Sequence, residues 1–297
     1  MGVSEWVTVA PGVRLDKSAP GVRLHVLRWF GSSDQPVRRT VVYVHGLSSN
    51  ARLWEGVAPL VSAFGHPGWA VDLRSHGASP ATESGYDTAT AADDVAAVIE
   101  AAGAGPCIVV GQSWGGNIAI ELAARHPSTV AGLALVDGGW FAPSTEFDSW
   151  AACEKALRPP DIDGQPAEDL RDRMRGWHPG WDDWALDATM ANLRVDDDKV
   201  YRRLTIEHHM AIVRNMWDNP PAARYPLVKV PVVLMPALSE DPSEAAARLA
   251  RVTSIAGGLA DATVSPYEGG DHDLHAQRPA EVAADVLGLA ARVDGTR

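Results

Sequence analysis

The sequence has few cysteines and no long apolar run. Its two cysteines, Cys107 and Cys153, are too few for a disulfide framework and suit a reducing compartment. Nowhere do about 18 apolar residues follow one another, and the first stretch, MGVSEWVTVAPGVRL, has no basic segment leading into an apolar one. We therefore expect a soluble, cytoplasmic protein that is neither secreted nor inserted in a membrane.

Positive charge is also scarce. There are 26 lysines and arginines against 38 aspartates and glutamates, so the net charge is −12 at pH 7. Phosphate groups would be repelled, which argues against nucleic acid or an anionic membrane as a partner and leaves a small molecule. The acidic run from Asp196 to Asp198 lacks the ligand spacing of a calcium loop and is typical of a solvated turn. No pattern predicts an oligomeric state.

What the sequence does contain is ordinary for a globular protein: 46% hydrophobic and 22% charged residues, in a chain of 297 that can bury a large core. Continuous apolar runs are typical of central parallel strands, which are buried on both faces. The clearest such run is TVVYVHG at 40–46. Further predicted strands, which alternate with helical patterns, are found at 69–73, 107–112, 130–139, 230–237 and 262–267. Two further strands, at 6–15 and 22–30, predict an antiparallel ribbon at the sheet edge. The fold class is α/β, with a mostly parallel sheet between helices.

The alternation breaks between residues 140 and 225. Strands vanish there, and the sequence becomes helical, charged and rich in tryptophan. We therefore expect one α/β core domain, formed by 1–139 and 226–297, that is interrupted by a helical cap over 140–225.

One motif, GQSWGG from Gly111 to Gly116, lies between a buried strand and an alanine-rich helix. Such a string is typical of a nucleophile elbow, in which a sharp strand-to-helix turn raises one side chain above the sheet. Here that side chain is Ser113. Gly111 and Gly115 are needed because a larger side chain would collide with the backbone of so tight a turn.

A serine becomes a nucleophile when a histidine removes its proton and a carboxylate orients that histidine. The segment GGDHDLHAQRP places His272 directly after the last predicted strand, from where it could reach Ser113. His275, three residues on, would point elsewhere if the loop turns into a helix. We expect His272 to be the base.

Four motifs follow one another along the chain in the order found in a known family: HG at 45–46, DLRSHGAS at 72–79, GQSWGG at 111–116 and GDHDLHAQRP at 270–279. The chain resembles the α/β-hydrolase superfamily. The resemblance implies a serine nucleophile that needs no metal or organic cofactor. It also implies an oxyanion hole formed by the amides of Leu47 and Trp114, with His45 supporting the first of these loops. Ser75 departs from the glycine that the family usually has.

The triad acid has several candidates. The usual family position follows the strand at 230–237 and offers Glu240 and Asp241, but the glycine-containing turn before that carboxylate is missing. Asp137, in LVDGG after the strand that follows the elbow, matches the placement in haloalkane dehalogenases and some lactone hydrolases. We favour Asp137, with Glu240 and then Asp241 as alternatives.

The cap resembles the lid that shapes the substrate pocket in this superfamily. We expect some of five cap residues to line that pocket: Trp177, Trp181, Trp184, Trp217 and His208. The predicted function is hydrolysis of an ester or lactone of a fairly hydrophobic small molecule through an acyl-enzyme. A carbon–carbon (diketone) hydrolase would use the same residues, and a non-catalytic small-molecule receptor could share the fold. Epoxide hydrolase and dehalogenase chemistry is disfavoured, because both use an aspartate where this chain has Ser113.

Overall fold

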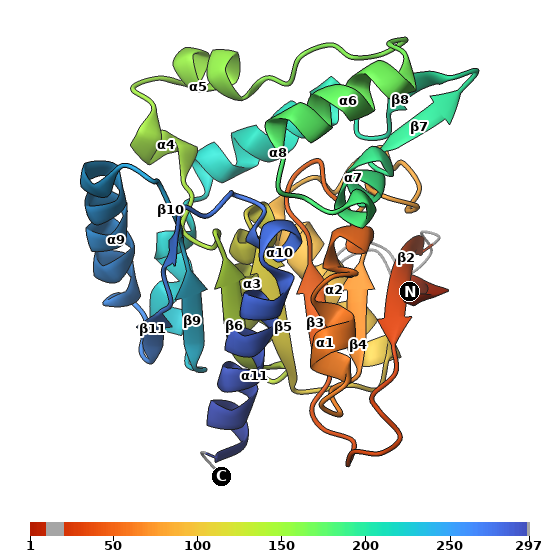
Figure 1. The fold of residues 1–297 in the computed structure, drawn as a ribbon. Helices are drawn as coiled ribbons and strands as arrows, with labels where there is room; N and C mark the ends of the chain where they lie inside the picture. The colour runs from red at the N-terminus through yellow and green to blue at the C-terminus, as the bar shows by residue number, and fades with distance from the viewer. Residues whose placement is uncertain (10–20, 296–297) are drawn as a thin grey trace.

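The computed structural model describes residues 1–9 and 21–295. An eight-stranded sheet runs through it in the order β1-β2-β4-β3-β5-β6-β9-β11 (Figure 1). Its strands are β1 (Val3–Val9), β2 (Val22–Trp29), β3 (Val41–Val44), β4 (Gly68–Val71), β5 (Cys107–Gln112), β6 (Val130–Val136), β9 (Val232–Met235) and β11 (Ala262–Val264). The strands from β4 to β11 pair in parallel, whereas β1 and β2 pair antiparallel at one edge. Both predictions are confirmed, although residues 10–15 of the first predicted strand lie outside the described residues.

The central strands are buried on both faces because helices cover both faces of the sheet. Val42 and Val44 face one hydrophobic core, and Val41 and Tyr43 face the other. The first core is closed by α2 (Thr88–Ala101), α3 (Trp114–Arg125) and α9 (Pro242–Ala256), and the second by α1 (Ala58–Ser62) and α11 (Pro279–Gly295). Strand side chains point alternately to opposite faces, so a run without polar residues is what two covered faces require.

The segment between β6 and β9 lies across one end of the sheet (Figure 1). It comprises α4 (Pro143–Glu146), α5 (Trp150–Leu157), α6 (Ala167–Trp177), α7 (Asp183–Met190), β7 (Leu193–Asp196), β8 (Lys199–Arg202), α8 (Ile206–Asp218) and the 3₁₀ helix η2 (Pro221–Leu227). The expectation that this segment contains no strands is wrong, because β7 and β8 form an antiparallel hairpin. Asp197 and Asp198 make its turn, with φ of 49° and 58°. Positive φ at both positions is the geometry of a two-residue hairpin.

Short elements complete the end of the sheet near the cap. They are η1 (Ala51–Trp54), α10 (Leu274–Gln277) and a parallel pair of two-residue strands, β10 (Ala237–Leu238) and β12 (Tyr267–Glu268).

Cys107 and Cys153 are both buried and are not bonded to each other. Over the ranges 1–9 and 21–295, no helix is long and apolar enough to cross a membrane.

Candidate active site

Ser113 lies at the turn between β5 and α3, with φ of 52° and ψ of −121°. A non-glycine residue rarely adopts such a backbone conformation, which costs roughly 1–3 kcal/mol and must be imposed by its surroundings. Nearby glycines permit the tight turn: a Cβ on Gly111 would collide with the carbonyl of Gly115, one on Gly115 with the carbonyl of Val44, and one on Gly138 with the backbone of Ser113. The expected steric role of the flanking glycines is confirmed.

His272 and Asp137 are joined directly. His272 Nδ1 lies 2.6 Å from Asp137 Oδ2, so Nδ1 carries the donated proton and Nε2 is left as the basic nitrogen. The other carboxylate oxygen, Oδ1, accepts hydrogen bonds from the amide of Ala237 at 3.0 Å and from Arg248 Nη2 at 2.7 Å. Asp137 is 5% exposed. Its carboxylate is therefore buried but hydrogen-bonded at both oxygens.

The pKa values of this pair move in opposite directions. Burial would raise the pKa of Asp137, but the hydrogen bond and charge of His272, with the charge of Arg248, outweigh it and lower the pKa. Burial would lower the pKa of His272, yet its hydrogen bond to Asp137 and the nearby charge of Asp273 raise it. The His272 side chain is 55% exposed, so solvent limits the effect of burial and the hydrogen bond to Asp137 prevails. The carboxylate thus favours a charged imidazolium.

The alternative acids lie elsewhere. Asp241 caps α9, and its Oδ1 accepts hydrogen bonds from the amides of Ser243 and Glu244. Glu240 is exposed and lies near Gly269. Among the described carboxylates, Asp137 is the one bonded to His272. We therefore retain Asp137 as the candidate acid.

His275 does not share the site of His272. Its ring is fully buried against the indole of Trp54, with ring centroids 4.5 Å apart. Burial lowers its pKa to about 3. A histidine that stays neutral within a packed cluster is a core residue, as its place in the following short helix α10 had indicated.

Ser113 and His272 line one cavity of about 850 Å³. Asp137, Leu47 and Trp114 also contact it. Its apolar wall comes from core and cap together, namely Trp140, Phe141, Ala156, Leu157, Pro159, Pro160, Val213, Met216, Ala247 and Val252. Within the described structure no hydrogen bond joins Ser113 Oγ to His272, and such bonds commonly tighten when substrate binds.

The expected cap residues do not line this cavity, which corrects the sequence-based expectation. Trp177 is 65% exposed, and Trp181 packs into a small core of the cap, stacked on His178. Trp184 packs against Gly56, and Trp217 meets Trp150 edge to face. The indoles of Trp181 and Trp184 thus belong to the packing of the cap and its contact with the core, whereas that of Trp177 is largely in solvent.

His208 is corrected in the same way, because its ring stacks on Tyr86 with centroids 4.0 Å apart. The neighbouring His209 lines the cavity instead. Its Nδ1 lies 3.0 Å from Ser48 Oγ, and its Nε2 lies 3.2 Å from the carbonyl of Leu157 in the cap. Two adjacent helical residues point in different directions, so only one of them could face the cavity.

The loop that carries Leu47 is held by two neutral histidines. His45 Nδ1 donates to the carbonyl of Gly46 at 2.7 Å, and its Nε2 accepts from the amide of Leu73 at 3.1 Å. His76 Nε2 accepts from the amide of Ser48 at 3.2 Å. Burial lowers the pKa of both rings, that of His76 to about 3. Both histidines are therefore uncharged: His45 holds the loop by donating to the Gly46 carbonyl, and His76 holds it by accepting from the Ser48 amide.

Ser75, the residue that departs from the family pattern, has a φ of 61°. This left-handed conformation favours glycine, which explains why a glycine would be usual there. In this chain the serine hydroxyl lies 2.6 Å from the hydroxyl of Tyr86. The strain is thus offset by a buried hydrogen bond that a glycine could not make.

Comparison of the sequence with known protein families gives one match that covers most of the site. The family model described as alpha/beta hydrolase fold matches residues 39–226, more than half of the chain. The chain belongs to the α/β-hydrolase family. The match includes the elbow, Asp137 and all of the cap.

Curated relatives of this α/β hydrolase share shorter stretches. It is 38% identical over 115 residues to an esterase of Mycobacterium tuberculosis, covering 38% of this chain and 36% of the relative. It is 34% identical over 173 residues to a lipase of the same organism, covering 57% of this chain and 61% of the relative. The matched stretch thus spans less than two thirds of either relative.

Two solved structures resemble this chain over nearly its whole length. The hydrolase of E-2-(acetamidomethylene)succinate has a TM-score of 0.70 at 22% identity, covering 97% of this chain and 99% of that one. A thioesterase domain from the curacin biosynthetic pathway has a TM-score of 0.72 at 20% identity, covering 96% and 99%. At such identities these structures establish the fold of this α/β hydrolase and nothing of its substrate.

Two residues of the site were not assigned from the sequence, although His209 is the neighbour of the predicted His208 on the same amphipathic helix. Arg248 lies in α9, far along the chain from Asp137, and only packing of the helix against the sheet brings its guanidinium to the carboxylate. His209 could have been found only from the rotation of α8. In the described part of this α/β hydrolase, no three histidine, cysteine or acidic side chains gather as a metal site would require.

Proposed function

We propose that this protein is a serine hydrolase that cleaves an ester or lactone of a fairly hydrophobic small molecule. The observation that carries the proposal is the His272–Asp137 pair beside Ser113 on one cavity wall. The esterase and lipase that share sequence with the chain support ester chemistry. The apolar wall of the cavity supports a hydrophobic substrate.

The chemistry would proceed in two halves. Ser113 Oγ attacks the carbonyl carbon while His272 Nε2 takes its proton, and Asp137 stabilises the resulting imidazolium. The amides of Leu47 and Trp114 would bind the alkoxide, which then collapses and expels the alcohol with a proton from His272. Water, deprotonated by the same histidine, hydrolyses the acyl-enzyme and releases the carboxylic acid. No metal or organic cofactor takes part.

A panel of p-nitrophenyl esters from acetate to octanoate, with simple lactones and a diketone, tests the proposal. We expect hydrolysis of esters or lactones and a loss of at least about 1000-fold in kcat for Ser113→Ala. Ser33→Ala, which changes an exposed serine away from the cavity, is the matched control and should keep full activity.

Circular dichroism should show that both variants are folded. If Ser113→Ala keeps its turnover, the nucleophile is assigned wrongly. If only the diketone is cleaved, and Ser113 is required, the reaction is carbon–carbon hydrolysis. Wild-type protein that binds these molecules without turning any over would be a receptor.

A further inference from the structure

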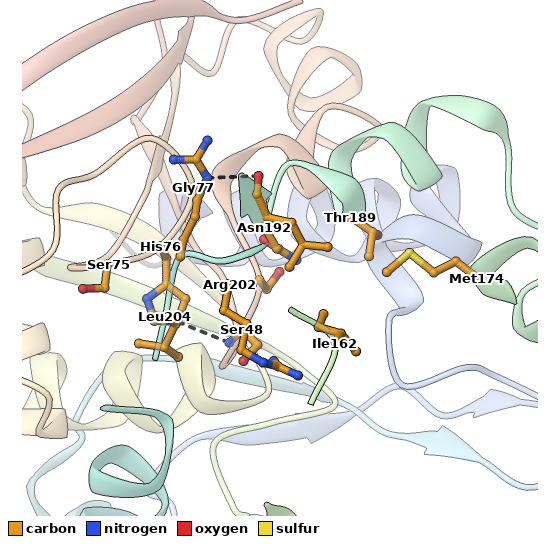
Figure 2. A pocket seen from close by; sticks show the side chains of 13 residues that line it. Ser48, Ser75, His76, Gly77, Ile162, Met174, Thr189, Asn192, Arg202 and Leu204 are labelled. Atoms are coloured by element: carbon orange, nitrogen blue, oxygen red, sulfur yellow. Dashed lines mark hydrogen bonds between the residues drawn. The ribbon is translucent and has the colours of Figure 1, made fainter. Parts of the chain in front are cut away.

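A second, smaller cavity lies between the core and the cap, with a volume of about 170 Å³ (Figure 2). Ser48, Ser49 and His76 contribute from two core loops, and Ile162 and Met174 from the cap. It shares no lining residue with the cavity that contains Ser113. Its volume corresponds to about six water molecules at about 30 Å³ each.

Two polar groups of this cavity have no hydrogen-bond partner within the described chain. They are Ser49 Oγ and Arg202 Nε, both shielded from solvent. Ser49 is 7% exposed. Burying a donor without a partner costs roughly 1–3 kcal/mol, so such groups call for an acceptor. Arginine can only donate, and the serine hydroxyl can donate as well, so the group that completes the cavity must accept hydrogen bonds.

The charge of the lining favours an anion over a neutral acceptor. Arg202 and Arg203 both line the cavity, and none of its described lining residues is acidic. This is a local reversal of sign in a chain whose net charge is −12. Arg203 Nε donates to the carbonyl of Leu193, and Arg202 Nη2 donates to that of Pro160. Each guanidinium has further N–H groups, since arginine carries five.

The remaining wall is partly apolar. It is formed by Ile162, Met174, Leu193 and Leu204. Free phosphate or sulfate would leave these side chains without a matching surface, whereas a short hydrocarbon tail would contact them. A cavity with donors and positive charge beside an apolar wall fits an anion with a small apolar part.

We propose that this second cavity is a binding site for a short-chain organic carboxylate. The carboxylate oxygens accept from Ser49 Oγ and Arg202 Nε, and the alkyl part lies against Ile162 and Leu204. The site is separate from the cavity of Ser113, and its occupation does not depend on the catalytic role of that serine.

Isothermal titration calorimetry with sodium acetate, propionate and butyrate, at constant ionic strength set by sodium chloride, tests the proposal. We expect saturable binding at one site, with a Kd at or below about 1 mM. Ser49→Ala removes an unpartnered hydroxyl and breaks no hydrogen bond within the chain, so it should fold normally. It should weaken binding by about tenfold, the usual effect of one hydrogen bond to a charged group.

Arg202→Gln removes the charge and should weaken binding at least as much. Its matched control is Arg194→Gln, which changes an exposed arginine of the same hairpin that pairs with Asp196 outside the cavity. The control should bind like wild type.

Three results would overturn the proposal. The first is no saturable binding of any of the three carboxylates. The second is equal binding by wild type and Ser49→Ala, which would place the anion elsewhere, including in the cavity of Ser113. The third is an equal loss of binding in Arg194→Gln and Arg202→Gln, which would indicate general charge attraction. Because calorimetry needs no turnover, these results stand whether or not the ester hydrolysis proposed above is found.

Discussion

Among single residues, Asp137 has the most connections within the candidate site. It accepts hydrogen bonds from His272, Ala237 and Arg248, and its own backbone has a φ of 41°. The next residue, Gly138, allows the close approach of this loop to the elbow, because a Cβ there would collide with the backbone of Ser113. A buried carboxylate that is bonded at both oxygens keeps one orientation, which is what a residue that orients a histidine needs.

We predict that Asp137→Asn lowers kcat by about 10⁴-fold, because an amide that donates to Nδ1 would hold His272 in the wrong tautomer. Glu240→Gln should leave kcat unchanged, since Glu240 is exposed and not bonded to His272. Steady-state kinetics on a p-nitrophenyl ester measures both. A large loss in the glutamine variant alone would assign the acid to Glu240.

Arg248 acts on both members of the His272–Asp137 pair. Its positive charge lies 2.7 Å from Asp137 Oδ1 and stabilises the carboxylate, but it opposes a second positive charge on His272. The other titratable groups that act on His272 are Asp137 and Asp273, which raise its pKa, and the nearby His275, which stays neutral. Arg248 therefore holds the pKa of His272 below the value that Asp137 and Asp273 alone would give.

We predict that Arg248→Met raises the pKa of His272 and moves the acid limb of kcat/KM to higher pH, because the neutral imidazole is the active form. Arg248→Lys keeps the charge and should keep the limb close to the wild-type position. NMR titration of His272 gives the same comparison without turnover. A loss of kcat in both variants with no movement of the limb would mean that Arg248 acts through geometry alone.

The sequence was informative about residues whose role depends on local geometry. Ser113 could be located because an elbow needs glycines within two residues of the nucleophile, and His272 because it follows the last predicted strand. Arg248 and His209 could not, since their positions depend on how a helix rotates against distant parts of the chain. The tryptophans of the cap were misassigned for the same reason: composition reveals bulk, not the direction of a side chain.

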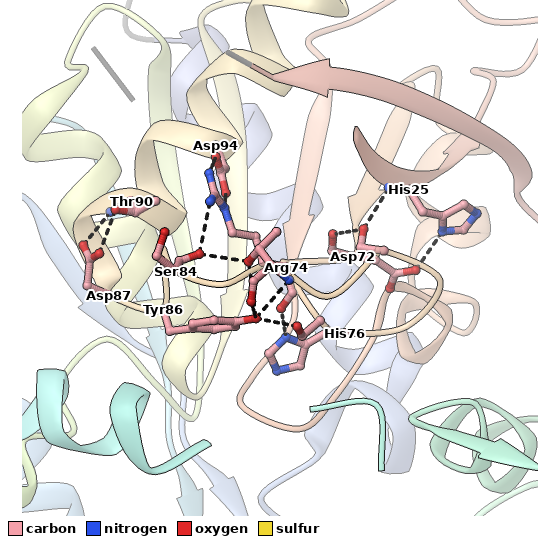
Figure 3. A network of polar contacts seen from close by, with 12 residues as sticks. His25, Asp72, Arg74, His76, Ser84, Tyr86, Asp87, Thr90 and Asp94 are labelled. Atoms are coloured by element: carbon pink, nitrogen blue, oxygen red, sulfur yellow. Dashed lines mark hydrogen bonds and ion pairs between the residues drawn. The ribbon is translucent and has the colours of Figure 1, made fainter. Parts of the chain in front are cut away.

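Among structural elements, the loop after β4 supports the loop that carries Leu47. Figure 3 shows its polar network, in which Arg74 lies against Asp94 of α2. Arg74 Nε and Nη2 donate to the two oxygens of Asp94 at 2.7 and 2.9 Å, and both side chains are buried. The carbonyl of Arg74 accepts from His76 Nδ1, and His76 holds the amide of Ser48. A helix, a loop and the candidate oxyanion loop are thus linked in series.

We predict that Asp94→Asn lowers the free energy of unfolding by about 3–5 kcal/mol, because it leaves the buried Arg74 guanidinium without its counter-charge. Asp218→Asn, which breaks the exposed pair with Arg214 on α8, should cost no more than about 1 kcal/mol. Urea denaturation followed by circular dichroism measures both. Equal small losses would show that the Arg74–Asp94 pair contributes little.

The strands of the large sheet were predicted from the sequence, whereas the hairpin of the cap was not. Strands of the sheet were clear because burial on both faces leaves uninterrupted apolar runs such as Val41 to Val44. The hairpin of β7 and β8 was missed, because its strands are mostly exposed and carry charged residues that resemble a loop. Its acidic turn was correctly expected to be a turn, since aspartate tolerates positive φ.

For the molecule as a whole, the parallel sheet explains why residues far apart in sequence meet. Ser113 follows β5 and Asp137 follows β6 of this sheet, and His272 follows β12, which pairs with β10 in a separate two-stranded sheet. Ligands of parallel sheets bind beyond the carboxyl ends of the strands. The cap closes that end and supplies Leu157, Val213 and Met216 to the cavity wall. Topology brings the reactive groups together, and the insertion between β6 and β9 shapes the space above them.

The most direct test of the Ser113–His272–Asp137 assignment is covalent trapping with a fluorophosphonate, followed by intact and peptide mass spectrometry. A serine activated by this pair should take up one phosphonyl group per chain, on the peptide that contains Ser113. Ser113→Ala should take up none, and Asp137→Asn should react far more slowly than wild type. No labelling of the folded wild-type protein, or labelling that persists in Ser113→Ala, would contradict the assignment.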